Sequence, residues 1–148
     1  MLQVFKTRKV KTPERNGLNA GFDFFIPEDF EPYSLYSNSN IIIPSGIKVR
    51  LPKYHVLIAF NKSGIATKNN LVVGACVIDE NYTGEIHLDI HNIGTQTIKI
   101  SPNKKIIQFI LIEQDYHLVK EVSSEKILYE GLDIKERGSK GFGSTNNQ

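Results

Sequence analysis

The sequence contains no tryptophan, one methionine and a single cysteine, Cys76, among its 148 residues. A single cysteine cannot form a disulfide within the chain, which indicates a reducing compartment such as the cytoplasm. No apolar run approaches the roughly 18 residues that a membrane-spanning helix needs. The first residues, MLQVFKTRKVK, lack the apolar core of a signal peptide. We therefore expect a protein of the cytoplasm, or of the host cytoplasm if the source is a virus, without a membrane partner.

A strong charge of either sign is also missing. The 18 Lys and Arg residues nearly balance the 16 Asp and Glu residues, for a formal net charge of +2. This charge is too small to indicate nucleic-acid binding. The basic cluster over residues 6–11 is expected to be a solvated edge strand. The length and the 40% share of hydrophobic residues are those of one globular domain.

Short β-branched or alternating runs, separated by proline and glycine, make up most of the chain. Such runs predict an all-β fold, a distorted jelly roll or β-barrel with many short strands. The runs cover residues 41–52, 54–60, 71–78, 84–93, 97–102 and 105–114. The stretch SGIATKNN (63–70) predicts one short helix with Ser63 as its cap.

The composition changes near residue 136. The final stretch, RGSKGFGSTNNQ (137–148), has Phe142 as its one large apolar residue. Such a stretch cannot bury enough apolar surface to become ordered by itself. We therefore predict a β domain over residues 1–135 and a flexible C-terminal arm over residues 136–148.

Two interior stretches carry groups that could do chemistry. NKSG (61–64) places a cation, a hydroxyl and a glycine at the start of the predicted helix. Free backbone N–H groups there could bind an anion, or the stretch could be only a capped turn. Asp79 follows an apolar run and precedes a turn, where it could orient a water or merely end a strand. Neither stretch alone decides between its two interpretations.

Together, however, five stretches in this order resemble the motifs of the trimeric dUTP pyrophosphatase (dUTPase) family. They are AGFDFF (20–25), NKSGIATK (61–68), GACVIDENYTGEI (74–86), NKKIIQFILIE (103–113) and RGSKGFGST (137–145). The resemblance implies a homotrimer of jelly-roll subunits, with active sites at the subunit interfaces that the C-terminal arms close. It implies hydrolysis of dUTP to dUMP and pyrophosphate, which keeps uracil out of DNA and supplies dUMP for dTMP synthesis.

The resemblance also assigns roles to individual residues. Asp79 matches the aspartate that orients the water attacking the α-phosphorus. Mg²⁺ is expected on the triphosphate, and Asp23 either reaches it through water or has a structural role. Tyr82 matches the tyrosine that packs against the deoxyribose and leaves no room for a 2′-hydroxyl. The other substrate-binding residues that the resemblance implies are Lys62, Ser63, Gly64 and Gln108 for the inner phosphates, Val73, Cys76 and Val77 for uracil, and Arg137, Phe142, Gly143, Ser144 and Thr145 on the arm.

The chain departs from the family pattern at several positions. Asn61–Lys62 stands where the family usually has Pro–Arg, and Lys104–Lys105 replaces the usual Asp–Arg. Cys76 lies where a glycine is frequent; it could tighten the uracil pocket or simply be a small buried hydrophobe. These differences indicate a divergent branch, of phage or viral origin.

One constellation lies outside these roles. His87, Asp89 and His91 alternate in GEIHLDIHN and would face one side of a strand, either as a polar surface or as metal ligands. Asp89 also falls where the related dCTP deaminases, which share the fold, carry a catalytic glutamate. A dCTP deaminase-related enzyme and a dUTPase-fold regulatory protein switched by a nucleotide are therefore the alternatives. Tyr82 and the complete arm motif favour the dUTPase.

Overall fold

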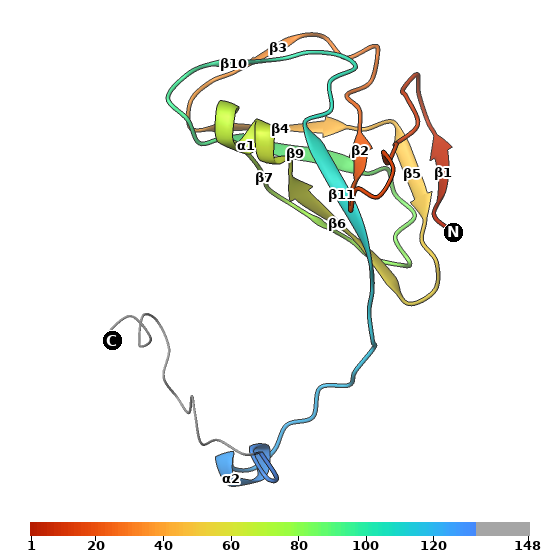
Figure 1. Ribbon diagram of the computed structural model, residues 1–148, viewed down its shortest axis with the longest axis vertical. Coiled ribbons are helices and arrows are strands. Elements are labelled where there is room, and N and C mark those ends of the chain that lie inside the picture. The colour runs from red at the N-terminus through yellow and green to blue at the C-terminus, as the bar shows by residue number, and fades with distance from the viewer. Residues whose placement is uncertain (133–148) are drawn as a thin grey trace. The chain divides into compact units, whose positions relative to one another are not determined.

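The computed structural model describes residues 1–132 and divides the chain into two units (Figure 1). The first unit covers Met1–Tyr116, and the second begins at His117. The predicted boundary between residues 135 and 136 lies outside the described residues.

The first unit consists mainly of short antiparallel strands, as the sequence predicts. The strands are β1 (Gln3–Lys6), β2 (Phe22–Phe24), β3 (Tyr33–Leu35), β4 (Ser39–Pro44), β5 (Ile47–Arg50), β6 (His55–Asn61), β7 (Leu71–Val73), β8 (Val77–Ile78), β9 (His87–Asn92), β10 (Ile98–Ile100) and β11 (Ile107–Glu113). The all-β prediction is confirmed.

The strands form four separate antiparallel sheets. The largest has the order β2-β11-β6-β8, and a three-stranded sheet has the order β4-β9-β7. Two further pairs, β1-β5 and β10-β3, extend the first unit. Strands β6 and β11 lie side by side from the pair Asn61–Ile107 to the pair His55–Glu113 (Figure 1). Among the described residues the sheets do not join into a closed barrel, so the jelly-roll form of the prediction is the appropriate one.

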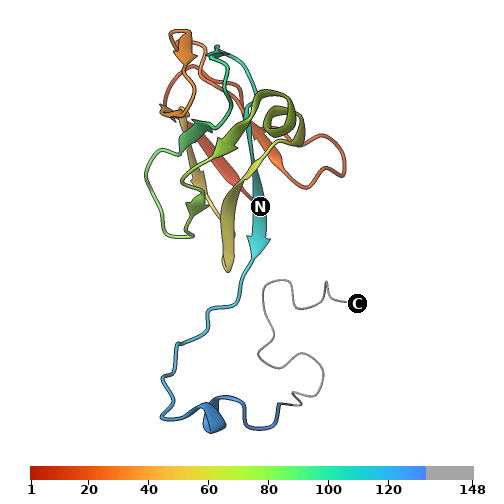
Figure 2. The ribbon, with the colours of Figure 1, turned by 90° about the vertical axis from the view of Figure 1, so that its left-hand side faces the viewer.

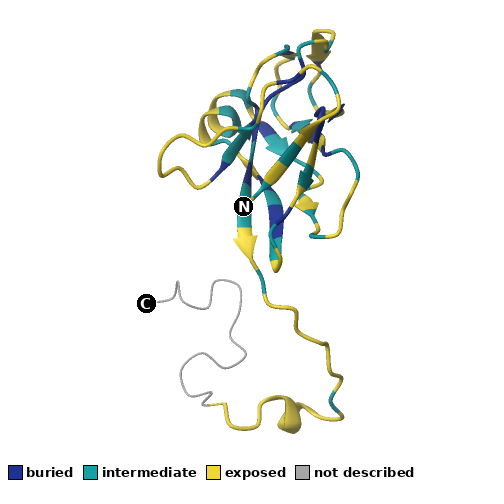
Figure 3. Cartoon of the chain, turned by 90° about the vertical axis from the view of Figure 1, so that its right-hand side faces the viewer, coloured by how far each residue is buried: buried dark blue, intermediate teal, exposed yellow. Residues whose placement is uncertain are grey.

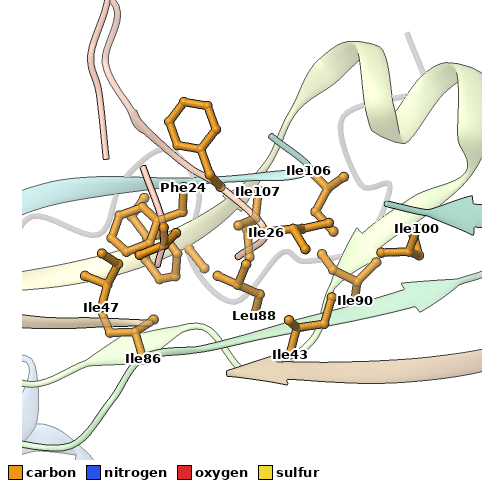
Figure 4. Packing of buried hydrophobic residues seen from close by; sticks show 14 of the residues in the cluster. Phe24, Ile26, Ile43, Ile47, Ile86, Leu88, Ile90, Ile100, Ile106 and Ile107 are labelled. Atoms are coloured by element: carbon orange, nitrogen blue, oxygen red, sulfur yellow. The ribbon is translucent and has the colours of Figure 1, made fainter. Parts of the chain in front are cut away.

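The hydrophobic core lies between the two larger sheets. Figure 4 shows Phe24 and Ile107 of one sheet pointing toward Ile43, Leu88 and Ile90 of the other. Each of these side chains is at most 1% exposed. Burying an apolar side chain of this size contributes about 1.5–3 kcal/mol, so the facing rows hold the sheets together. Figure 3 shows the buried positions on the strands of the first unit, whereas most of residues 117–132 are exposed.

Helix α1 (Ser63–Asn69) connects β6 to β7 (Figures 1 and 2). The predicted helix is therefore confirmed, but the prediction that Ser63 caps it is wrong. The extended residue before the helix is Lys62, with φ −86° and ψ 122°, and no side chain caps the helix there. The backbone leaves β6 extended through Lys62, so Ser63 already lies inside the first turn. The helix ends at Asn70, whose N–H still bonds to Ala66 O and whose left-handed φ of 51° turns the chain out of the helix.

The second unit contains a short helix, α2 (Glu125–Leu128), that we did not predict from the sequence. Its cap is Ser124, whose side chain accepts a hydrogen bond from the N–H of Ile127 at 3.4 Å. The sequence signal was present, because serine is a preferred cap, but no apolar period marks so short a helix. In residues 1–132 no helix is both long and apolar enough to cross a membrane.

Candidate active site

A small cavity of about 210 Å³ lies beside the turn that follows β8. Residues 75–79 line it together with Tyr82 and His87. It therefore brings together Cys76, Val77, Asp79 and Tyr82, the residues predicted to contact uracil, water and deoxyribose. The cavity is smaller than the roughly 300 Å³ at which ligand pockets begin. By itself the cavity is therefore too small to enclose a drug-sized ligand.

The turn after β8 holds Tyr82 in a defined position. The N–H of Tyr82 donates to Asp79 O at 3.1 Å, which closes the turn. Its hydroxyl donates to Glu85 O at 2.9 Å. The ring lies over Gly84, where a Cβ atom would come within 2.3 Å of the Tyr82 hydroxyl oxygen. The absence of a side chain at Gly84 therefore allows Tyr82 to lie against its own turn.

The segment before the cavity is anchored to β6 through its backbone. Cys76 O accepts a hydrogen bond from Ala59 N at 2.7 Å, and the N–H of Val73 donates to Asn61 Oδ1 at 2.8 Å. The Val73 N–H therefore already has a partner within the chain, whereas Cys76 O keeps a second lone pair for another donor. Cys76 is half-buried, packs against the core and also lines the cavity. Its side chain is therefore both a partly buried apolar group and a part of the cavity wall, the two interpretations that the sequence left open.

Asp89 on β9 anchors the same segment from the other side. It is 8% exposed and accepts hydrogen bonds from Ala75 N at 2.9 Å and Asn40 Nδ2 at 3.5 Å. His91 Nε2 lies 3.3 Å from Asp89 Oδ1, the same oxygen that accepts from Asn40. A Cβ atom on Gly74 would come within 2.2 Å of Asp89 Oδ2, so the glycine lets the backbone approach the carboxylate. Asp89 is thus a structural acceptor for the loop.

The row of His87, Asp89 and His91 does not form a metal site in the described chain. His87 is exposed, and its Nδ1 lies 3.0 Å from Glu85 O. Within residues 1–132, no group of three or more His, Cys, Asp or Glu side chains could hold a metal ion. Because Asp89 is buried, the row does not form one polar surface of the strand: Asp89 holds the loop, while His87 is exposed.

The residues predicted to meet phosphate or metal gather at a second place. Asp23 on β2 forms ion pairs with Lys62 and with Lys105, whose Nζ lies 3.2 Å from Asp23 Oδ2. Lys105 Nζ also lies 3.0 Å from Glu14 Oε1. Hydrogen bonds to Glu14, first, and to Asp23 raise the pKa of Lys105, so it is a cation at neutral pH. Asp23 is thus already neutralised by protein cations.

Ser63, Gly64 and Gln108 belong to this second place. Ser63 and Gly64 open α1, where backbone N–H groups have no partner within the helix. A Cβ atom on Gly64 would meet nothing within 4 Å, so neither packing nor conformation requires glycine there. Gln108 Nε2 donates to the backbone O of Asn61 at 2.8 Å, which ties β11 to the entry of α1.

The two places are separate within one chain. None of Asp23, Lys62, Ser63, Gly64 and Gln108 lines the cavity beside Asp79. The predicted arm residues Arg137, Phe142, Gly143, Ser144 and Thr145 lie outside the described residues. Cys76, Val77, Asp79 and Tyr82 thus line a cavity that these phosphate residues do not line, whereas Val73 bonds to Asn61, next to Lys62.

Sequence reasoning missed several residues that shape the site. It did not foresee that Lys105 and Lys62 share Asp23, or that Asn61 holds Val73. It also missed Glu80, which bonds to Tyr54 and Tyr116. The one available signal for Glu80 was its place directly after Asp79 in the turn.

Together, the fold and the cavity define an all-β jelly-roll protein with a site at an acidic, tyrosine-bearing turn. A family model described as dUTPase matches residues 8–146. The chain belongs to the dUTPase family.

Relatives from animals and viruses agree with this assignment. The chain is 32% identical over 126 residues to the deoxyuridine 5′-triphosphate nucleotidohydrolase of Mus musculus, covering 85% of this chain and 72% of the relative. It is also 32% identical over 143 residues to the Variola virus protein of that name, covering 96% and 90%. A further match, 33% identical over 132 residues, is to the Pol polyprotein of equine infectious anemia virus; it covers 89% of this chain but only 11% of that polyprotein.

Solved structures of phage dUTPases share the fold. The Staphylococcus bacteriophage 80alpha dUTPase with dUPNHPP has a TM-score of 0.81 and 25% identity and covers 98% of both chains. A variant of the phage phi11 dUTPase, whose structure reveals coordination of a structural Mg(II) ion, has a TM-score of 0.75 and 21% identity; it covers 85% of this chain and 99% of that one.

Proposed function

We propose that the protein hydrolyses dUTP to dUMP and pyrophosphate. The observation that carries the proposal is the single cavity in which Asp79, Tyr82, Cys76 and Val77 meet, since these are the residues that the family resemblance assigns to water, sugar and base. The names of the mouse and Variola virus relatives support the same substrate. In the cell, the reaction would keep uracil out of DNA and supply dUMP, and we propose that it takes place in the cytoplasm.

In this proposal Asp79 orients a water toward the α-phosphorus and accepts its proton. A positioned carboxylate base contributes about 10²–10⁴ in rate. Tyr82 packs against the deoxyribose, where its ring excludes a 2′-hydroxyl. Lys62 and the first backbone N–H groups of α1 bind phosphate oxygens, with Lys62 as a point charge where the family usually has arginine. Gln108 supports this binding by holding the entry of α1 in place.

Magnesium fits this chain as a partner of the substrate. The residues near Asp23 offer lysines as well as carboxylates, and the described side chains supply no cluster of three acidic or imidazole ligands. Such a setting suits Mg²⁺ that is held mainly by phosphate oxygens and waters. When one of the lysines leaves Asp23 to bind phosphate, the freed Asp23 carboxylate would contact the ion through a water molecule. The bound ion would neutralise charge on the triphosphate.

The cavity beside β8 supports a homotrimer with shared sites. Asp79 lines this cavity, but none of the residues proposed for phosphate does, so in this proposal a second subunit supplies them. The arm residues Arg137 and Phe142, with Gly143, Ser144 and Thr145, would close that site over the terminal phosphate and the uracil ring.

The dCTP deaminase alternative is disfavoured by the position of Asp89. A catalytic acid has to reach the substrate, whereas Asp89 is buried, bonds to Ala75 N and does not line the cavity. The regulatory alternative has a parallel in the phage 80alpha dUTPase, which is described as controlling transfer of virulence genes. For this chain, such a role would be an addition to hydrolysis.

The test is a panel of dUTP, dCTP, dTTP and UTP, assayed for pyrophosphate and ammonia. We expect pyrophosphate from dUTP alone and a loss of about 10²–10⁴ in kcat for Asp79→Asn. Asp29→Asn, a change in a surface ion pair with Arg8, is the matched control and should keep full activity. Ammonia from dCTP, or undiminished hydrolysis by Asp79→Asn, would refute the proposal. Light scattering of the same protein would report whether it is a trimer.

A further inference from the structure

A second cavity, of about 410 Å³, lies beside Asp79. Its lining residues are Lys53, Tyr54, Asp79, Glu80, Asn81, Gln114 and Tyr116. Asp79 also lines the smaller cavity with Tyr82. Asp79, the carboxylate proposed to orient water, therefore lines two cavities. No function has yet been assigned to the second, larger one.

The second cavity is held together by a ring of hydrogen bonds centred on Glu80. Glu80 Oε2 accepts from Tyr54 N at 2.7 Å and from the Tyr116 hydroxyl at 2.8 Å. Gln114 Nε2 donates to the Tyr116 hydroxyl oxygen at 3.0 Å, and Gln114 N donates to Tyr54 O at 2.9 Å. The carboxylate thus joins the turn before β6, the turn after β8 and the end of β11. We call Tyr54, Glu80, Gln114 and Tyr116 the Glu80 clasp.

Tyr54 has a backbone conformation that is unfavourable for an isolated tyrosine. Its φ is +60°, in the left-handed region where a bulky side chain is a genuine outlier. Such a conformation persists only where the surroundings impose it. Here the bond to Glu80, the Tyr116 ring at 5.9 Å between centroids and Lys53 Nζ at 4.6 Å from the Tyr54 centroid hold it. These contacts therefore fix the backbone conformation of Tyr54 within the clasp.

Asp79 has no such support of its own. Among residues 1–132 its carboxylate makes no hydrogen bond, so its position depends on the backbone of the turn. The neighbouring residue in that turn is Glu80, whose side chain is bonded twice. The hydrogen bond to Glu80 also raises the pKa of Tyr116 above its usual range, so the hydroxyl remains a donor throughout the working pH range.

We propose that Glu80 and Tyr116 are positioning residues that set the place of Asp79 for attack on the substrate. The inference rests on the proposed function and adds the device that holds the water-orienting carboxylate. Tyr116 is also the last residue of the first unit. The chain therefore leaves the β domain at one of the two residues that hold the turn bearing Asp79.

Three substitutions and one matched control test the inference. Glu80→Ala removes both hydrogen bonds, and Tyr116→Phe removes one hydroxyl while keeping the ring. Glu80→Gln keeps a neutral acceptor for Tyr54 N and Tyr116. Tyr54→Phe is the control, because the Tyr54 hydroxyl has no hydrogen bond within the described residues, whereas its ring and backbone are kept.

We expect kcat for dUTP to fall about 10- to 100-fold in Glu80→Ala, the cost of a displaced catalytic group, and about three- to tenfold in Tyr116→Phe. KM, and the Kd of a non-hydrolysable imido analogue of dUTP, should stay within about twofold, since ground-state contacts are unchanged. Glu80→Gln should recover most of kcat, and Tyr54→Phe should match the wild type.

Several results would overturn the inference while leaving the proposed function intact. Suppose that the wild type cleaves dUTP and that Asp79→Asn abolishes the activity. An unchanged kcat in Glu80→Ala and Tyr116→Phe would then mean that the clasp does not position Asp79. Equal losses in Tyr116→Phe and Tyr54→Phe would mean that the loss does not come from the bond between Tyr116 and Glu80, because both variants keep their rings and only Tyr116 makes that bond. A lower Tm with unchanged kcat would make the clasp a purely structural feature. Failure of the wild type to cleave dUTP would instead refute the proposed function.

Discussion

The buried carboxylate of Asp89 accepts a hydrogen bond from the backbone N–H of Ala75 at 2.9 Å. This bond joins β9 to the segment that lines the cavity beside Asp79. It gives Asp89 a structural role. Asp89 does not line the cavity, but the shape of the cavity depends on this bond.

Replacing Asp89 by alanine should therefore destabilise the protein and weaken substrate binding. The change leaves the Ala75 N–H without its acceptor, at a cost of about 1–3 kcal/mol in the free energy of unfolding. We also expect KM for dUTP to rise, because the segment carrying Cys76 loses its anchor. Denaturant unfolding and steady-state kinetics measure the two effects. Asp89→Asn, which keeps an acceptor, should restore most of the stability; an alanine variant as stable as wild type would contradict the assigned role.

Gly84→Ala should alter the discrimination between dUTP and UTP. The added Cβ would lie 2.3 Å from the Tyr82 hydroxyl oxygen and 2.4 Å from Cζ, so the ring has to move off its turn. A displaced ring no longer excludes the 2′-hydroxyl, and we expect the preference for dUTP to fall about tenfold or more. The ratio of kcat/KM for the two nucleotides measures this. Discrimination that survives in Gly84→Ala would show that the placement of Tyr82 does not determine it.

The shared pairing of Asp23 predicts different effects at two adjacent lysines. Lys105 takes part of the charge of Asp23, so Lys105→Gln should leave Lys62 held more tightly by that carboxylate and less available to phosphate. We expect KM for dUTP to rise about two- to fivefold, the size of one partly exposed ion pair. Lys104 is exposed and has no ion pair in residues 1–132, so Lys104→Gln is the matched control. Equal effects of the two changes would indicate only a general loss of positive charge.

Much of the fold could be predicted from the sequence. The alternating runs predicted most of the strands, and SGIATKNN predicted α1, because periodicity and turn residues act over neighbouring positions. The cap at Ser63 was predicted wrongly because the helix start depends on how far β6 remains extended, which its pairing with β11 decides. Helix α2 was missed because four residues carry too little pattern.

The candidate site could be predicted only where one stretch of chain supplies it. Cys76, Val77, Asp79 and Tyr82 lie within one short segment, so the motif placed them together before the cavity was known. The bond between Glu80 and Tyr116 spans 36 positions, and the bond between Gln108 and Asn61 spans 47. No local pattern indicates such pairs.

The sequence by itself determined where most of the strands lie along the chain, the start of the helix to within a residue, and the acidic turn with its tyrosine. The tertiary structure alone decided that Asp89 accepts a hydrogen bond from Ala75 N and that two lysines pair with Asp23. It also decided that Glu80 bonds to Tyr54 before β6 and to Tyr116 after β11. The physical reason is that strand register places distant residues opposite one another, and register depends on the packing of all the strands at once.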